Sequence, residues 1–219
     1  GYIGEDADEL GYYIVKKNTC QKQLAFLSSQ IGRDHGDFSE FWRLRNYTHL
    51  VKNIKAATFI IHGQNDWSVK QTHAINLWKA LELADLAPRK MYLHSGGHIY
   101  PTSNNTVHKV QQWFDFHLRG KASSIMSEPR IQVQMNNKKI ISQNYWPSEN
   151  TTQKLFYFNE SKLTSSPRSQ SSIITIFDNG REQKISSLLK NPDKKIANRA
   201  IFTTDRFKRD VVLSGSGQV

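Results

Sequence analysis

The sequence is poor in cysteine and in long apolar runs. Its 219 residues include a single cysteine, Cys20, which therefore cannot form a disulfide within the chain. One unpaired cysteine fits a reducing compartment, so the cytoplasm is the expected location. No apolar run approaches the roughly 18 residues that a membrane-spanning helix requires, and we expect no membrane partner.

The usual motifs of metal enzymes are missing as well. The sequence contains neither an HExxH nor a CxxC pattern. His94 and His98 are four residues apart, but Gly96 and Gly97 between them indicate a loop, whereas a metal-binding pair at this spacing needs a helix. We therefore expect no metal site and no cofactor.

Basic residues outnumber acidic ones, 30 to 19, which gives a formal net charge of +11. Such an excess indicates a nucleic-acid partner when the basic side chains form a continuous stripe. Here they are scattered along the chain in short groups, such as residues 16–17, 138–139 and 194–195. The pattern is typical of a solvated surface, and no nucleic-acid partner is expected.

Short apolar runs alternate with amphipathic stretches in the middle of the chain. Residues 57–61 and 91–93 are rich in β-branched, aromatic or long apolar side chains, as is typical of strands buried on both faces of a parallel sheet. Residues 69–84 and 107–118 place apolar side chains at helical spacing. The order strand, helix, strand, helix predicts a parallel sheet covered by helices.

The pattern changes after Lys121 to short strands joined by polar connectors. The candidate strands are residues 131–135, 155–158, 173–177, 200–203 and 210–213. Few helical stretches separate them, which predicts an antiparallel β-sandwich or jelly roll. The last residues stop where a further strand is expected to begin, so we interpret the sandwich as incomplete.

Two triad-type residues directly follow the two central strands. Asp66 stands in His62-Gly63-Gln64-Asn65-Asp66-Trp67, and His98 stands in Ser95-Gly96-Gly97-His98. Because catalytic groups collect at the carboxyl ends of parallel strands, we expect these two side chains to meet there. In α/β-hydrolases the chain order is serine, then acid, then histidine, and a carboxylate bonded to the imidazole fixes the tautomer of the base.

Each residue also has a simpler interpretation. An aspartate after a strand is often a turn-former or a helix cap, and most histidines are structural. The combination of both residues in the required order favours catalysis. The remaining histidines near these elements, His62, His73, His94 and His108, are interpreted as packing or surface residues.

The serine of such a triad is not found. No GxSxG motif occurs, and the serines of the chain lie in polar linkers or in the β-rich half. The chain opens with Gly1-Tyr2-Ile3, without an initiator methionine or a secretory signal. We therefore expect a C-terminal fragment of a longer protein, with the serine upstream and no activity of its own.

Several segments together resemble the Xaa-Pro dipeptidyl-peptidases, serine peptidases related to the cocaine-esterase-like acyl hydrolases. They are GEDAD at 4–8, FWRLRNY at 41–47, IKAATFIIHGQNDWSVK at 54–70, MYLHSGGHIY at 91–100 and FDFHLRG at 114–120. The resemblance covers nearly the whole chain and is densest before residue 120. It implies the C-terminal part of an α/β-hydrolase domain followed by a partial jelly roll.

The resemblance also assigns boundaries and roles. It implies a helical or cap segment at residues 1–47, the α/β-hydrolase core at 48–122 and the β-sandwich at 123–219. Asp66 would be the triad acid, His98 the triad base, and Glu5 the carboxylate that binds the free α-amino group of a peptide substrate. Family members commonly have Asn where Ser68 stands, so help to the amine from that position is not assured.

The function implied is release of N-terminal Xaa-Pro dipeptides by a cytoplasmic homodimer acting on peptides with Pro at the second position. Two alternatives remain open. One is a related acyl ester or amide hydrolase, which would keep Asp66 and His98 without needing Glu5. The other is a non-catalytic β-sandwich binding protein attached to a degenerate hydrolase.

Overall fold

The computed structural model describes residues 18–31, 38–167, 169–170, 173–177 and 185–215. The chain divides into two compact units, residues 1–148 with 216–219, and residues 149–215. Glu5 lies outside the described residues.

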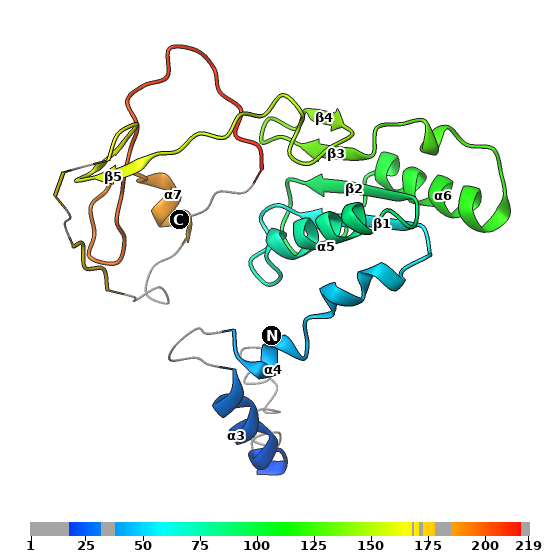
Figure 1. Cartoon of the computed structure of the whole chain (residues 1–219), viewed down its shortest axis with the longest axis horizontal. Coiled ribbons are helices and arrows are strands. Elements are labelled where there is room, and N and C mark those ends of the chain that lie inside the picture. Colours follow the sequence, from blue (N-terminus) through cyan, green and yellow to red (C-terminus); the bar gives the residue numbers. More distant parts are fainter. Residues whose placement is uncertain (1–17, 32–37, 168, 171–172, 178–184, 216–219) are drawn as a thin grey trace. The chain divides into compact units, whose positions relative to one another are not determined.

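The first unit is built on a four-stranded sheet with the order β1-β2-β3-β4 (Figure 1). β2 is parallel to both β1 and β3, and β4 is antiparallel to β3. At one end of this sheet, β1 has β2 as its one neighbour among the described residues. The strands are β1 (Thr58–Gly63), β2 (Arg89–His94), β3 (Ile131–Gln134) and β4 (Ile140–Gln143).

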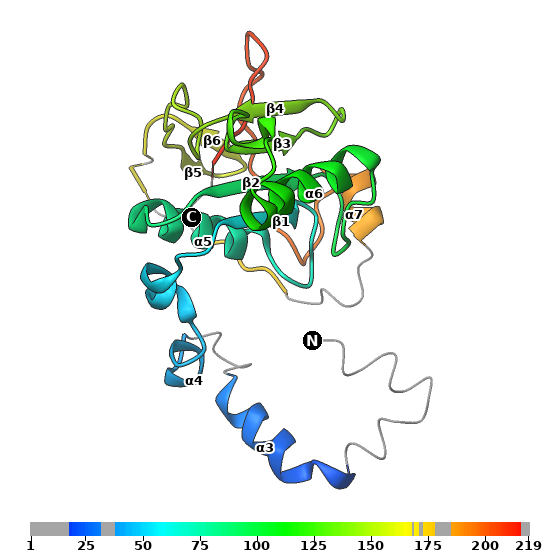
Figure 2. The same ribbon diagram turned by 90° about the vertical axis from the view of Figure 1, so that its right-hand side faces the viewer.

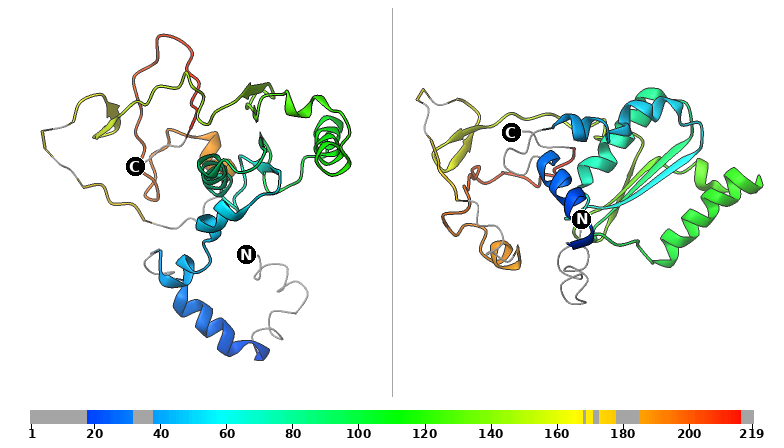
Figure 3. Two further views of the ribbon diagram at one scale, coloured as in Figure 1. Left: turned by 45° about the vertical axis from the view of Figure 1, so that its right-hand side comes forward. Right: turned by 90° about the horizontal axis from the view of Figure 1, so that it is seen from below.

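The two long helices, α5 (Gln71–Ala84) and α6 (Asn104–Arg119), cover opposite faces of this sheet (Figure 3, right). Ile60 of β1 belongs to the core cluster that α5 completes with Trp78. The preceding residue of the strand, Phe59, points the other way, and its ring lies 5.6 Å from that of Trp113 in α6. This alternation follows from the two-residue period of a strand, and it makes the first unit an α/β fold.

Every residue of the central strand β2 is buried, including two basic ones. Met91 and Leu93 lie in the core, where each contributes about 1.5–3 kcal/mol of hydrophobic stabilisation. The charged ends of Arg89 and Lys90 are compensated: Arg89 pairs with Asp85 at 2.8 Å, and Nζ of Lys90 donates to two backbone carbonyl oxygens, at 3.0 and 3.1 Å. The strand therefore begins at Arg89, two residues before its apolar run.

The described residues before β1 form helices and connecting loops, with no strand among them (Figure 2). Trp42 links two parts of this segment, because its indole N–H donates to the carbonyl of Ile31 at 3.2 Å. The short helices of the first unit are α3 (Gln21–Gln30), α4 (Glu40–Arg43), η1 (Tyr47–Asn53) and η2 (Ser124–Met126).

The end of α6 is defined by a glycine. Ser103 caps its start by accepting from the backbone N–H of Thr106, and Gly120 ends it with φ 64°, the left-handed conformation that glycine adopts without strain. The segment after Gly120 returns to the sheet as β3, so residues beyond 122 contribute to the first unit. The division into residues 1–47, 48–122 and 123–219 stays a prediction.

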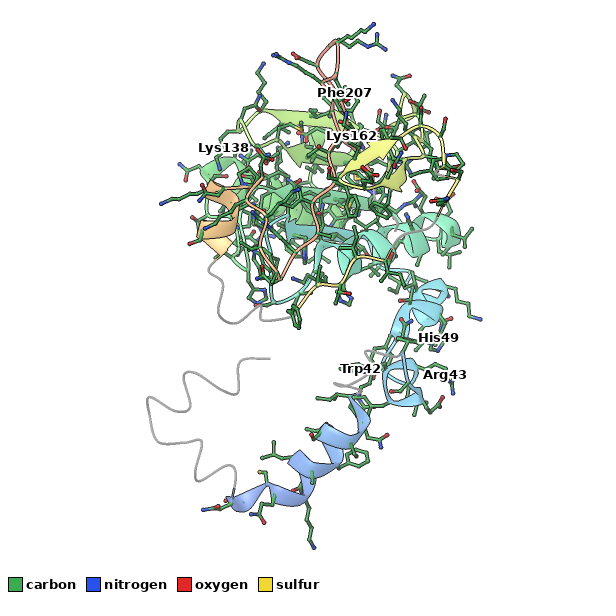
Figure 4. All side chains as sticks on the ribbon, turned by 90° about the vertical axis from the view of Figure 1, so that its left-hand side faces the viewer. Trp42, Arg43, His49, Lys138, Lys162 and Phe207 are labelled. Atoms are coloured by element: carbon green, nitrogen blue, oxygen red, sulfur yellow. The ribbon has the colours of Figure 1, made fainter. Side chains whose placement is uncertain are left out.

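The second unit contains a hairpin of β5 (Tyr157–Asn159) and β6 (Lys162–Thr164), and the helix α7 (Ile185–Lys190). Lys162, labelled in Figure 4, pairs with Asp205 at 2.9 Å. Residues 173–177 form no strand, although the backbone N–H of Phe177 donates to the carbonyl of Ala197. The β-sandwich stays a prediction.

Across the described ranges, none of the helices combines the length and the apolar character needed to cross a bilayer.

Candidate active site

The turn after β1 holds Asp66 in place. The strand ends at Gly63, whose carbonyl accepts from the backbone N–H of Asp66 at 3.2 Å. One carboxylate oxygen, Oδ1, accepts from the backbone N–H groups of Ser68 and Val69, both at 2.9 Å. Asp66 is thus a turn-former, as its simpler interpretation has it, and this role uses one of its two oxygens.

The second oxygen of Asp66 contacts the loop after β2. Its Oδ2 lies 2.8 Å from Nδ1 of His98, a length typical of a charge-assisted hydrogen bond. The contact expected from the two strand ends is therefore present. The register explains it, because Gly63 pairs with His94 and the two loops leave the sheet side by side.

The surroundings of Asp66 keep its carboxyl group ionised. Burial acts to raise the pKa of Asp66, but the hydrogen bonds from Val69, His98 and Ser68 together outweigh it and lower the pKa to about 2. The side chain of Asp66 is 5% exposed, whereas that of His98 is 64% exposed. The buried carboxylate of Asp66 is thus bonded to an imidazole that is exposed to solvent.

This geometry suits acid–base chemistry. With Nδ1 held by the carboxylate, the proton on His98 occupies that nitrogen in the neutral ring, and Nε2 is left to accept a proton. When Nε2 takes the proton, the imidazolium is stabilised by the same carboxylate. The pair can therefore act as a general base and then as a general acid.

A glycine that the motif analysis did not single out permits the contact. A Cβ on Gly63 would lie 2.2 Å from the carbonyl oxygen of Gly97 and 2.6 Å from that of Gly96, closer than real contacts come. A Cβ on Gly97 would meet one atom, at 3.4 Å. Of the glycines that bring the two loops together, Gly63 therefore makes a closer approach than Gly97 does. Its place at the end of β1, opposite a glycine-rich loop, was the available signal.

The loop that carries His98 is also tied to the turn after β1 and to β3. Oε1 of Gln134 accepts from the backbone N–H of Ser95 at 3.1 Å and from its hydroxyl at 2.9 Å. Nε2 of Gln64 donates to the backbone carbonyl of Gln134 at 2.7 Å, and Nδ2 of Asn65 donates to that of Ser95 at 2.9 Å. Lys138, labelled in Figure 4, donates to the Ser95 hydroxyl at 2.8 Å.

These amides were not found by sequence reasoning. Gln134 belongs to a strand that was assigned to the β-rich half, and its partner strand was not predictable from local patterns. Gln64 and Asn65 stand beside Asp66 in the sequence, but amides alone carry no chemical signature.

Two histidines beside the pair are more closely involved than expected. Nε2 of His62 lies 3.0 Å from the carbonyl of Val69 and 4.0 Å from Oδ2 of Asp66. His94 is 4% exposed, and burial, with a smaller effect from the nearby His62, lowers its pKa. Both are packed, as interpreted from the sequence, but they pack against the site itself. His73 and His108 are exposed on α5 and α6.

No metal centre competes with this interpretation within the ranges described. Those residues include no group of three or more His, Cys, Asp and Glu side chains that could hold a metal ion. A hollow of about 850 Å³ lies elsewhere, between η1 and α5, with Trp42, Tyr47, Val51 and His73 among its lining residues. Neither Asp66 nor His98 lines it.

Comparison with known proteins identifies relatives over the whole chain. The family model of X-Pro dipeptidyl-peptidase (S15 family) matches residues 4–100. A Bacillus anthracis protein, named provisionally as an Xaa-Pro dipeptidyl-peptidase, is 32% identical over 225 residues, covering 100% of this chain and 38% of the relative. The Xaa-Pro dipeptidyl-peptidase of Ligilactobacillus salivarius is 28% identical over 250 residues, covering 100% of this chain and 30% of the relative.

These relatives are much longer than the chain, which spans well under half of either one. Among solved structures, a CocE/NonD family hydrolase from Staphylococcus aureus matches with a TM-score of 0.48 at 15% identity, covering 63% of this chain and 25% of that one.

Proposed function

Because this chain belongs to the X-Pro dipeptidyl-peptidase (S15) family, we propose that it is part of a serine exopeptidase that releases N-terminal Xaa-Pro dipeptides. Asp66 is the triad acid and His98 the triad base. The observation that carries this proposal is the 2.8 Å contact between Oδ2 of Asp66 and Nδ1 of His98, at the ends of adjacent parallel strands.

The proposed reaction proceeds through an acyl-enzyme. The serine, on a part of the protein outside this sequence, attacks the carbonyl carbon after the proline while His98 takes its proton at Nε2. His98 then returns the proton to the leaving amine. Water repeats the sequence on the ester, with His98 again as the base, and the dipeptide is released.

Glu5 is proposed as the anchor for the α-amino group of the substrate. A dipeptidyl-peptidase must measure two residues from a charged terminus, and a carboxylate at a fixed distance does so by a charge-assisted hydrogen bond. Location in the cytoplasm and assembly as a homodimer are proposed on the family resemblance alone.

The function is tested by assaying the full-length protein that contains this chain on three substrates. These are Ala-Pro-anilide, its N-acetylated form and a simple aryl ester. A dipeptidyl-peptidase cleaves the first and spares the second. Preference for the ester would favour the related acyl hydrolase, and cleavage of none would favour the binding module.

The origin of the serine has its own test. We expect purified residues 1–219 to show no turnover that a serine-directed inhibitor abolishes, since the chain has no GxSxG motif. Measurable inhibitor-sensitive turnover by this chain would contradict the assignment of the serine to another part of the protein.

A further inference from the structure

The loop between β2 and the catalytic histidine closes around one buried side chain. His94 is the last residue of β2 and is 4% exposed. Its Nδ1 accepts a hydrogen bond from the backbone N–H of Gly96 at 3.1 Å. His94 therefore contacts the loop two residues before His98.

The bond from Gly96 defines the chemical state of His94. A nitrogen that accepts from an amide N–H carries no proton, so the ring is neutral, with its proton on Nε2. Burial acts in the same direction, because it lowers the pKa of His94. Two groups that carry or can carry charge also act on the ring: His62 lowers its pKa further, whereas Asp66 raises it.

The fit between ring and loop is close. A Cβ on Gly96 would lie 2.9 Å from Nδ1 of His94 and 3.3 Å from Cδ1 of Ile99. The loop is short, and the N–H of Ile99 donates back to the carbonyl of Gly97 at 2.8 Å. The loop thus has little freedom to move while the ring stays in place.

We propose that His94 is a positioning residue for His98: its neutral ring holds the 95–99 loop at Gly96, so that Nδ1 of His98 stays against Asp66. This inference rests on the proposed function where it concerns catalysis, but its geometric part does not. The hydrogen bonds of Gln134 to Ser95 fix the beginning of the same loop, and the hydrogen bond of His94 to Gly96 fixes its middle.

Two variants of His94 separate its hydrogen bond from the space that its ring fills. His94→Leu fills the space but removes the acceptor for the N–H of Gly96. His94→Asn places an amide oxygen near the position of Nδ1, so it keeps that acceptor and loses the rest of the ring. His108→Asn, on the exposed surface of α6, is the matched control.

Kinetics are measured on the full-length protein with Ala-Pro-anilide, per mole of folded enzyme. Since misplacing a catalytic group by about 1 Å costs on the order of 100-fold in rate, we expect kcat of His94→Leu to fall about 100-fold. KM should change less than about twofold, because the loop does not bind the amino terminus in this proposal. We expect His94→Asn to recover most of the loss, to within about tenfold of wild type, since it keeps the acceptor for Gly96. His108→Asn should match wild type.

A crystal structure of the His94→Leu protein tests the geometry without any assay. We expect the distance from Nδ1 of His98 to Oδ2 of Asp66 to exceed 3.5 Å, against 2.8 Å here. An unchanged distance would overturn the proposal. An unchanged kcat of His94→Leu would also overturn it, provided that His98→Ala is inactive in the same assay. If the wild-type protein cleaves no Xaa-Pro substrate, the proposed function fails while the measured distance still decides the role of His94.

A second variant keeps the test available if His94→Leu does not fold. Gly96→Ala brings a methyl group to 2.9 Å from the same nitrogen, and it disturbs the contact from the loop side. It should lower kcat with little change in KM, and the combined Gly96→Ala, His94→Asn variant should lose less than the product of the two separate losses. Independent, multiplicative losses would overturn the proposal.

Discussion

Replacing Gly63 with alanine is expected to separate the catalytic pair. The added Cβ would lie 2.2 Å from the carbonyl oxygen of Gly97, whereas ordinary contacts begin near 3.4 Å, so the loops must part by about 1.2 Å. The obstacle is backbone rather than the end of a flexible side chain, and it cannot rotate away. A shift of this size along the bond from Asp66 to His98 would lengthen it from 2.8 Å to as much as about 4 Å, beyond hydrogen-bonding distance.

The expected consequences differ for rate and stability. A displacement of about 1 Å in a catalytic group costs on the order of 10²-fold in kcat. The overpacking itself costs about 1–3 kcal/mol of the free energy of unfolding. Both are measured on the full-length protein, kcat with Ala-Pro-anilide and stability by urea unfolding.

Gly97→Ala is the matched control. Its Cβ would meet one atom at 3.4 Å, and the φ of Gly97 lies outside the left-handed region, so both kcat and stability should stay close to wild type. Wild-type kcat in Gly63→Ala, together with an intact bond between His98 and Asp66 in its crystal structure, would refute the reasoning. Equal losses in the two variants would refute it as well, because a general need for glycine would then explain them.

Other perturbations follow from the same contacts. Asp66→Asn should keep the turn through its side-chain oxygen and lower kcat by about 10³–10⁴-fold, measured with Ala-Pro-anilide, because the base loses its charged partner. The folded-state pKa of Asp66 is about 2, below its ordinary 3.8. The ionised carboxylate therefore stabilises the fold above about pH 4, and this contribution is lost as the pH falls toward 2. The difference in Tm between wild type and Asp66→Asn should shrink over this range. Gln134→Leu should cost about 1–3 kcal/mol in urea unfolding by leaving the Ser95 N–H without its acceptor, and Gln134→Glu, which keeps an acceptor oxygen, should cost less. Glu5→Gln should raise KM for Ala-Pro-anilide and leave kcat nearly unchanged, and an unchanged KM would reject the anchor.

The local part of the fold was predictable from sequence. Residues 57–61 predicted β1 and residues 69–84 predicted α5, within two residues of their observed limits. The signals were strong because a continuous apolar run and a helical period are both local. The start of β2 was missed, because Arg89 and Lys90 look exposed in the sequence and are compensated by Asp85 and by backbone carbonyls that come from other elements.

Pairing between distant segments was not predictable. Alternation in residues 131–135 predicted a strand, but nothing local indicated that it would lie parallel to β2 instead of in a separate sheet. The same reason applies to the site. Strand ends and residue order predicted that Asp66 and His98 meet, whereas the amide of Gln134 and the ring of His94 act through contacts that depend on register and on the path of the loop.

The position of β1 at the edge of the described sheet has a consequence for this chain in solution. Its residues Thr58 to Ile61 carry no charge and no proline, and β1 is hydrogen-bonded to a neighbour on one side among the described residues. Such an edge strand offers a row of backbone donors and acceptors to any extended segment that contacts it. If two copies of this chain pair there through their own strands, self-association of residues 1–219 increases with concentration, which analytical ultracentrifugation would measure. A lysine introduced on this strand would hinder that docking.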